Sequence, residues 1–319
     1  MSELALAVFA SETGTHLLRR PMTARWSAHV RSFDAPAYEQ RLARAGFRFV
    51  PRSSPDFPGL LSAVHDPPVG LFVRGEADLE LLSRPSVAIV GARACSGYGA
   101  AAARVVAADI ARAGLVVVSG LARGVDAEAH RGALEAGAST VAVLGCGIDR
   151  DYPAAHAELA RRIAATGLIV SEYAPGVEPA PWRFPARNRI VAGLSTATIV
   201  VEARERSGAL ITADLALEEG REVFAVPGEI TSALSAGTNA LLKLGASPLT
   251  CADDVLSCFG LEPAAASRVD SPLLELLPAS ADEIVRRTGR TAAEVARELV
   301  ELELGGAAVV HDGVYRAAR

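Results

Sequence analysis

The sequence lacks the features that mark membrane, secreted and metal-binding proteins. It has no run of about 18 apolar residues, the length that a membrane-spanning helix needs, and charges interrupt its first thirty residues, where a signal peptide has an apolar stretch. Its four cysteines include no CxxC pair, so the sequence indicates neither a zinc site nor a disulfide framework. We therefore expect a soluble, cytoplasmic protein with reduced cysteines, no metal and no cofactor.

Basic charge is also scarce. The formal net charge is −5, and Lys243 is the only lysine. This excludes a uniformly basic surface for nucleic acid, so any contact with DNA must come from a local patch of arginines.

The chain is long and rich in apolar residues. Its 319 residues are 50% hydrophobic, which is enough to bury a sizeable core divided among two or three domains.

Short β-branched apolar runs alternate with alanine-rich helical stretches from residue 86 to residue 249. Such alternation is typical of βαβ units, and the runs Val116 to Val118 and Ile199 to Val201 are apolar on both faces, as in strands covered by helices on both sides. We count about six strands. The pattern predicts an α/β fold with a doubly wound, Rossmann-like parallel sheet.

The flanking segments predict smaller parts. Residues 1–54 read as an N-terminal helical or connector region, residues 55–258 as the core, and residues 259–270 as a linker. Residues 271–319 hold three helical pieces followed by a strand, an Asp-Gly turn and a strand, which is the order of a winged-helix domain. Ser280 and Thr291 supply helix N-cap signals.

The third helical piece of this tail is rich in acidic residues. Glu294, Glu298, Glu301 and Glu303 stand against Arg297 alone, which is a poor surface for phosphates. Winged helices often bind DNA through this helix. Here we favour a protein contact or a packing role.

Six glycine-rich or polar segments follow the expected strands, at the edge where open α/β sheets bind ligands. They are VGARACSGYG, SGLARGVDAEAH, GCGIDRDYP, SEYAPG, WRFPARNRIVAG and EARERSGALITA. Neither GxGxxG nor GxxxxGK[ST] is present, so the dinucleotide and P-loop motifs are missing. Each glycine turn alone is explained by tight βα geometry. Together, with arginines in the same loops, they predict a phosphate-binding rim. The rim residues are Gly91, Arg93, Ser119, Gly120 and Arg123.

The segment WRFPARNR places aromatic rings beside arginines. Single-stranded nucleic acid binds such surfaces, because its bases stack on rings while its phosphates meet cations. We favour a binding role for Phe184, with packing as its alternative, and packing for Trp182.

Candidates for catalysis are few. HExxH, GxSxG and clustered acidic metal motifs are all absent, which argues against metal-dependent nuclease chemistry. Asp126 and His130 form an i, i+4 pair that would orient an imidazole, although a hydrogen bond supporting the neighbouring loop explains His130 better. Glu172 and Glu202 either stand at the mouth of the pocket or position arginines. We expect that the protein is not an enzyme.

Across residues 55–256 the motifs occur in a fixed order: VGAR, SGLARGVDAEAH, VLGCGIDRDYP, GLIVSE, FPARNRIVAGLS, VVEARERSGALITA, GREVFAVPG and GTNALLKLGA. This series resembles the DprA/Smf family of DNA-processing proteins, whereas the first fifty residues match it poorly. The resemblance implies a core that binds single-stranded DNA without sequence specificity. It also implies a homodimer, and the loading of a RecA-type recombinase during DNA uptake and natural transformation.

The resemblance also implies roles for particular residues. Arg93 matches the arginine of a GSR-like motif, with Ala92 in place of the commoner serine. The FPxRNR motif, which in the family supplies phosphate contacts and a base-stacking ring, is matched by Phe184, Arg187, Asn188 and Arg189. Ser207 and Gly208 match the SG that precedes the next helix.

Two alternatives remain open. A phosphoribohydrolase of the lysine-decarboxylase-like group has a related nucleotide pocket, but its PGGxGTxxE motif is absent; release of free base from nucleoside monophosphates would support it. A module that senses a small nucleotide would bind a mononucleotide and not an oligonucleotide.

Overall fold

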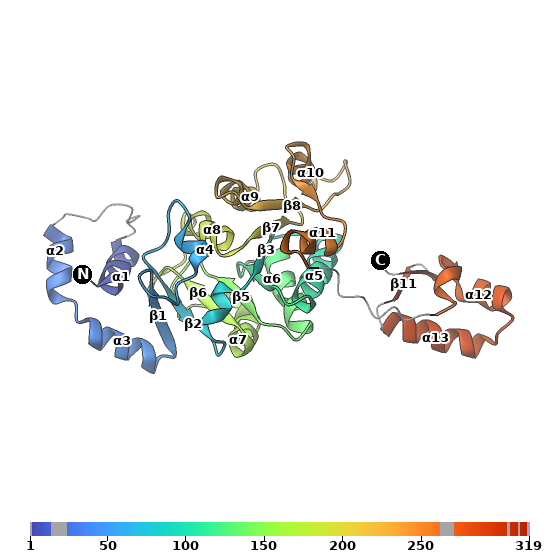
Figure 1. The fold of residues 1–319 in the computed structure, drawn as a ribbon, viewed down its shortest axis with the longest axis horizontal. Coiled ribbons are helices and arrows are strands. Elements are labelled where there is room, and N and C mark those ends of the chain that lie inside the picture. The colour runs from blue at the N-terminus through green and yellow to red at the C-terminus, as the bar shows by residue number, and fades with distance from the viewer. Residues whose placement is uncertain (1, 14–23, 262–270, 305–306, 312, 318–319) are drawn as a thin grey trace. The chain divides into compact units, whose positions relative to one another are not determined.

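The computed structural model describes residues 2–13, 24–261, 271–304, 307–311 and 313–317. The chain divides into two compact units, Met1–Glu262 and Pro263–Arg319. The first is an α/β unit and the second has a winged-helix architecture (Figure 1). No helix in the described ranges is both long and apolar enough to cross a membrane.

A nine-stranded sheet forms the centre of the first unit, in the order β1-β2-β6-β5-β4-β3-β7-β8-β9 (Figure 1). The strands are β1 (Phe47–Pro51), β2 (Gly70–Arg74), β3 (Ser86–Val90), β4 (Val116–Ser119), β5 (Thr140–Val143), β6 (Leu168–Ser171), β7 (Ala197–Val200), β8 (Glu222–Ala225) and β9 (Ser247–Pro248). In the part of this order that runs from β6 to β9, every two neighbouring strands are parallel. The chain builds outward from β3 to β6 and then returns to β7 on the other side of β3. This confirms the doubly wound core.

Helices cover both faces of this sheet. They are α4 (Gly59–Ser62), α5 (Gly97–Arg112), α6 (Val125–Glu135), α7 (Ala157–Thr166), α8 (Arg183–Leu194), α9 (Gly208–Glu218), α10 (Ala236–Lys243) and α11 (Asp253–Leu256). Short 3-10 turns lie at Leu79–Ser83, Ala154–His156 and Ser257–Phe259. Alternate strand residues face opposite layers: Val118 packs in the cluster with α8 and α9, and Val117 in the one with α5 and α6.

The N-terminal segment adds both helices and strands to this core. Its helices are α1 (Glu3–Thr13), α2 (Ala24–Ser32) and α3 (Ala35–Arg44). Leu4 and Val8 of α1 pack in one cluster with Phe72 of β2 and Leu144. Strand β1 pairs antiparallel with β2, and β2 pairs antiparallel with β6. Between residues 86 and 249 the structure has seven strands, β3 to β9, of which β9 is only two residues long, so the estimate of about six holds for that range. Strands β1 and β2 lie before it and were not predicted, because they lie within or beside a proline-rich stretch that hides their pattern.

The second unit holds β10 (Ala279–Ser280), α12 (Ala281–Thr288), α13 (Ala292–Leu304), β11 (Ala308–His311) and β12 (Val314–Ala317). Both expected N-caps form: Ser280 Oγ accepts a hydrogen bond from Glu283 N, and Thr291 forms a reciprocal capping box with Glu294. The three expected helical pieces are present, but the first is only a 3-10 turn at Leu274–Leu276. Pro278 comes two residues after the turn, and it favours the extended backbone that Leu277 adopts, so the turn does not continue into a longer helix.

Candidate nucleic-acid interface

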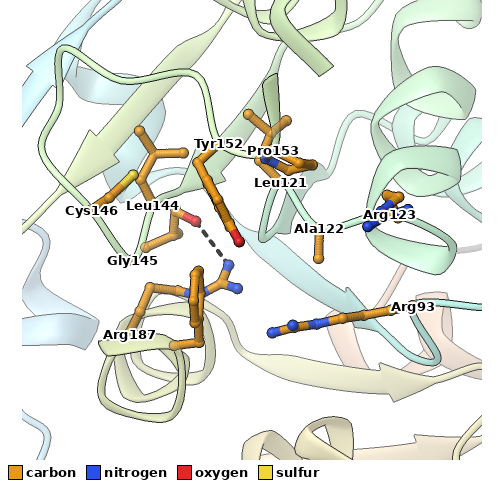
Figure 2. A pocket seen from close by; sticks show the side chains of 12 residues that line it. Arg93, Leu121, Ala122, Arg123, Leu144, Gly145, Cys146, Tyr152, Pro153 and Arg187 are labelled. Atoms are coloured by element: carbon orange, nitrogen blue, oxygen red, sulfur yellow. Dashed lines mark hydrogen bonds between the residues drawn. The ribbon is translucent and has the colours of Figure 1, made fainter. Parts of the chain in front are cut away.

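A small pocket of about 70 Å³ lies at the carboxyl ends of β3, β4 and β5, beside the start of α8 (Figure 2). Its lining comes from the loops after β3, β4 and β5, from the end of β5 and from this helix. The residues are Arg93, Leu121, Ala122, Arg123, Val143, Leu144, Gly145, Cys146, Tyr152, Pro153, Phe184 and Arg187. The pocket therefore combines arginines and aromatic rings with apolar walls, at the sheet edge where doubly wound folds bind ligands.

Helix α8 brings Phe184 and Arg187 to the pocket together, because residues three apart share a helix face. The Phe184 ring has neighbours from two other loops. Its centroid lies 5.2 Å from the guanidinium carbon of Arg93 and 5.5 Å from the ring centroid of Tyr152, at an interplanar angle of 29°. A methyl group on Gly145 would approach Phe184 Cδ1 to 2.9 Å, so the glycine lets the ring lie close to the backbone.

Arg187 is buried, with 5% of its surface exposed. Its Nη1 donates a hydrogen bond to the carbonyl oxygen of Val143 at 2.8 Å. Burial lowers the pKa of Arg187, and the neighbouring charge of Asp126 acts in the opposite direction. Gly120 lies between these two side chains, since an added Cβ there would collide with both. Gly120 thus leaves room for the arginine at the bottom of the pocket.

His130 fixes the loop that carries Gly120. Its Nε2 lies 2.5 Å from the Gly120 carbonyl oxygen and its Nδ1 lies 2.8 Å from Thr140 Oγ1. Burial lowers the pKa of His130 to about 4, so the imidazole is neutral at pH 7. Of the two interpretations of this histidine, loop support therefore fits the structure.

The rim of the pocket is positively charged. Arg93 and Arg123 are exposed, and no carboxylate in the described ranges forms an ion pair with either. Figure 2 shows Arg93 and Tyr152 reaching toward Arg187 from different sides, with Arg123 farther along the rim. A chain of net charge −5 thus has a local cationic patch of the kind that phosphates require.

A carboxylate lies at the N-terminus of α5, in the loop after β3. Glu202 is buried and accepts hydrogen bonds from Ser96 N at 2.8 Å and from Ser96 Oγ at 2.5 Å. Ser96 is the N-cap of α5. A helix N-terminus at this switch point is where nucleotide-binding folds hold a phosphate. Here the protein's own carboxylate takes that position.

Other predicted site residues lie outside the pocket lining. Ser119 Oγ donates to Ile89 O at 2.6 Å, Asn188 Nδ2 donates to Gly208 O at 3.1 Å, and Ser207 caps α9. Gly91 packs closely against Val125, so a side chain there would collide. The side chains of Ser119, Asn188 and Ser207 are thus used for hydrogen bonds to the backbone.

Arg189 does not line the pocket and forms ion pairs elsewhere. It contacts Glu172 through Nη2 at 2.5 Å and Asp66 through Nε at 3.2 Å. Its charge is thus matched by two carboxylates, and Glu172 positions an arginine, which is one of the two roles expected for it.

Sequence reasoning did not single out Tyr152, Pro153, Gly145 or Cys146 as site residues. All four line the pocket and belong to the GCGIDRDYP segment, whose position after a strand was the available signal. Burial raises the pKa of Cys146 to about 11, so its thiol is protonated at pH 7 and is a poor nucleophile.

Comparisons with known proteins agree on one family. The family model described as DNA recombination-mediator protein A matches residues 48–260, and a DprA winged helix domain model matches residues 248–313. The DNA processing protein DprA of Streptococcus pneumoniae is 48% identical over 64% of this chain and 71% of its own length. Protein Smf of Escherichia coli is 38% identical over 98% of this chain and 88% of its own.

Solved structures give the same result. The crystal structure of S. pneumoniae DprA aligns with a TM-score of 0.69 at 38% identity, over 82% of this chain and 94% of that one. The structure of Helicobacter pylori DprA, described as giving insight into its single-stranded DNA binding mode, aligns with a TM-score of 0.60 at 32% identity, over 67% of this chain and 95% of that one. The chain therefore belongs to the DprA/Smf family of DNA-processing proteins.

Proposed function

We propose that this protein binds single-stranded DNA, without sequence specificity, at the pocket and its rim. The observation that carries the proposal is the combination of Arg93 and Arg123, which have no carboxylate partners in the described ranges, with aromatic rings in one pocket. Cations paired with stacking surfaces suit an unpaired strand. The H. pylori relative, whose structure concerns single-stranded DNA binding, supports the same ligand.

The absence of sequence preference follows from the kind of contact. Guanidinium groups on phosphates and rings on base faces do not distinguish one base from another. We expect the rim arginines to supply most of the salt-dependent affinity.

The small-nucleotide alternatives fit this chain less well. Both need a phosphate site, and the N-terminus of α5 already holds the carboxylate of Glu202. A phosphate placed there would meet a buried negative charge, which costs free energy. Family membership also favours DNA processing over nucleotide hydrolysis.

Beyond DNA binding, we propose that the protein is a homodimer, is not an enzyme, and loads a RecA-type recombinase during DNA uptake. These proposals rest on the family resemblance. Loading would be measured as stimulation of recombinase ATPase activity on DNA already coated by a single-strand-binding protein. A lack of stimulation there would contradict it, as a monomer in sedimentation would contradict the dimer.

Replacing Arg93 tests the proposed binding site. In Arg93→Ala we expect the affinity for a labelled single strand to fall about tenfold and the salt slope of log K to decrease by about 1, because one phosphate contact is lost. Fluorescence anisotropy at two salt concentrations measures both. The matched control is Arg84→Ala. Arg84 is an exposed arginine just before β3, at the amino ends of the parallel strands and so at the opposite end from the pocket. If the two variants bind alike, the site assignment is wrong.

A further inference from the structure

The segment from α2 to the residue after β1 is strongly basic, in a chain that is acidic overall. Residues 24–52 contain six arginines and only two acidic residues, Asp34 and Glu39, which gives the segment a formal net charge of +4. Because the whole chain carries −5, the remaining residues carry −9. The six arginines are Arg25, Arg31, Arg41, Arg44, Arg48 and Arg52.

The charge of these arginines is not neutralised within the protein. All six are exposed, and no carboxylate in the described ranges forms an ion pair with any of them. Asp34 is the N-cap of α3 and accepts a hydrogen bond from Ala37 N at 3.0 Å, so its carboxylate already has a partner. Arg48 donates to the carbonyl oxygens of Gly75 and Ala77, which are neutral acceptors. The segment therefore presents positive charge to solvent.

The fold brings the elements of this segment together. Helices α2 and α3 lie with β1 at one end of the first unit, where α3 contacts β1, the edge strand of the sheet (Figure 1). Arg41 and Arg44 are three residues apart on α3 and so share one flank of that helix. The guanidinium carbon of Arg41 lies 4.8 Å from the centroid of the Tyr38 ring. We call the six exposed arginines of residues 24–52 the N-terminal basic surface.

Large apolar side chains are almost absent from this surface. Trp26 is only 5% exposed and packs its ring against Phe9. Among the large hydrophobic residues of the segment, Val30 alone is exposed, at 38%. A helix that lies on a membrane inserts an apolar face, and a single strand needs exposed rings on which its bases stack. The N-terminal basic surface offers neither of these.

Arginines without exposed rings suit the phosphate backbone of a duplex. Double-stranded DNA carries one negative charge per about 1.7 Å of its axis, twice the density of a single strand. Guanidinium groups spread over two helices and a strand therefore meet more phosphates on a duplex. The contact needs no access to the bases, which are stacked inside the double helix.

The N-terminal basic surface and the pocket belong to the same compact unit. Tyr38 of α3 packs against the hydrophobic cluster that contains Cys146 and Ile148, and Cys146 lines the pocket. The helices that carry the arginines are thus packed behind the loop that shapes the pocket. A DNA molecule with a single-stranded tail and a duplex part can contact both.

We propose that the N-terminal basic surface binds the phosphate backbone of double-stranded DNA, and that it acts together with the pocket at a junction between a single strand and a duplex. The duplex contact is independent of the pocket, whereas the joint action at a junction rests on the proposed function. By itself the surface holds a duplex weakly, because it contacts only a few phosphates. Joined to a strand held in the pocket, the duplex is kept at a high effective concentration and binds more firmly.

The test compares two labelled oligonucleotides by fluorescence anisotropy: a single strand of about 20 nucleotides, and the same strand extended by a duplex of about 20 base pairs. We expect the wild-type protein to bind the tailed duplex about tenfold more tightly than the single strand. In the double variant Arg41→Ala/Arg44→Ala this advantage should fall to about twofold or less, and the salt slope of log K for the tailed duplex should decrease by about 2. Its affinity for the single strand should not change.

Two further double variants serve as controls. Arg84→Ala/Arg112→Ala removes the same charge from exposed arginines at the amino ends of the parallel strands, and it should retain the advantage. Arg41→Lys/Arg44→Lys keeps the charge and should retain most of it, which separates the loss of charge from the loss of the contact between Arg41 and Tyr38. Circular dichroism confirms that each variant is folded.

The outcomes that overturn the proposal differ from those that overturn the proposed function. If the wild-type protein binds the tailed duplex no more tightly than the single strand, or if Arg41→Ala/Arg44→Ala keeps the full advantage, the basic surface does not bind duplex DNA, while single-strand binding stands. If the same variant weakens both oligonucleotides equally, the arginines contact the single strand instead. If the protein binds neither oligonucleotide, the proposed function fails as well.

A membrane is the other polyanion that this surface would meet. Vesicles of phosphatidylglycerol test it in a sedimentation assay. Binding of these vesicles that is lost in Arg41→Ala/Arg44→Ala, with no effect of that variant on the tailed duplex, would assign the surface to lipid and overturn the proposal. An absence of vesicle binding, together with the loss of the duplex advantage, would support it.

Discussion

At the scale of single residues, the pocket depends on buried polar groups that hold its loops. His130 and Arg187 both hydrogen-bond to backbone carbonyls at the ends of strands, those of Gly120 and Val143. Such groups are stabilising only while their partners remain in place, because a buried polar group without a partner is costly. The geometry of the pocket therefore depends on the stability of the core beneath it.

The buried His130 makes stability depend on pH. Its folded-state pKa of about 4 lies below the ordinary value of 6.5, so the unfolded chain binds the proton more readily. The stability that the neutral His130 contributes is fully present above pH 6.5 and is lost as the pH falls from 6.5 through 4. The free energy of unfolding then decreases by up to about 3 kcal/mol. Urea denaturation across this range should show it. His130→Gln is neutral throughout, so the wild type should lose stability relative to this variant on acidification. Parallel pH profiles would contradict the prediction.

At the scale of elements, helix α8 explains why one motif serves several purposes. Successive residues of a helix point about 100° apart, so the consecutive letters of FPARNR face different neighbours. Phe184 and Arg187 face the pocket, Asn188 reaches the start of α9, and Arg189 pairs with Asp66 and Glu172. The motif therefore builds the site and also attaches the helix to the rest of the core.

Helix α1 contacts the loop that leads from β6 to α8. Ser11 is buried, and its Oγ accepts a hydrogen bond from Ala174 N at 3.0 Å, in the loop after β6. In Ser11→Ala this amide loses its acceptor, and we expect the free energy of unfolding to fall by about 1–3 kcal/mol. The control is Ser32→Ala on α2, where an exposed hydroxyl donates to the carbonyl oxygens of Ala28 and His29 in its own helix and the change should stay within about 0.5 kcal/mol. Equal effects in a denaturant titration would contradict the support role.

The elements that the sequence predicted are those with local signals. The alternation between residues 86 and 249 predicted the doubly wound core, and serine and threonine N-caps predicted the starts of α12 and α13. Strands β1 and β2 were missed because five-residue strands beside prolines carry little periodicity. The ion pair of Arg189 with Asp66 and the stacking of Tyr152 on Phe184 were also missed, since each joins residues far apart in the sequence.

At the scale of the whole molecule, function depends on local charge more than on total charge. The chain is acidic overall, yet Arg93 and Arg123 stand exposed at the mouth of an aromatic pocket. A rim of this kind attracts phosphates, and the rings favour unpaired bases. We therefore expect a preference for single strands, where phosphates and base faces are both accessible.

The most direct test is a fluorescence-anisotropy titration of labelled single-stranded and duplex oligonucleotides of about 20 nucleotides, at about 50 and 200 mM salt. The proposed function predicts tight binding of the single strand, at least about tenfold tighter than the duplex, and weaker binding at the higher salt concentration. Absent binding, or an equal or greater affinity for the duplex, would contradict it.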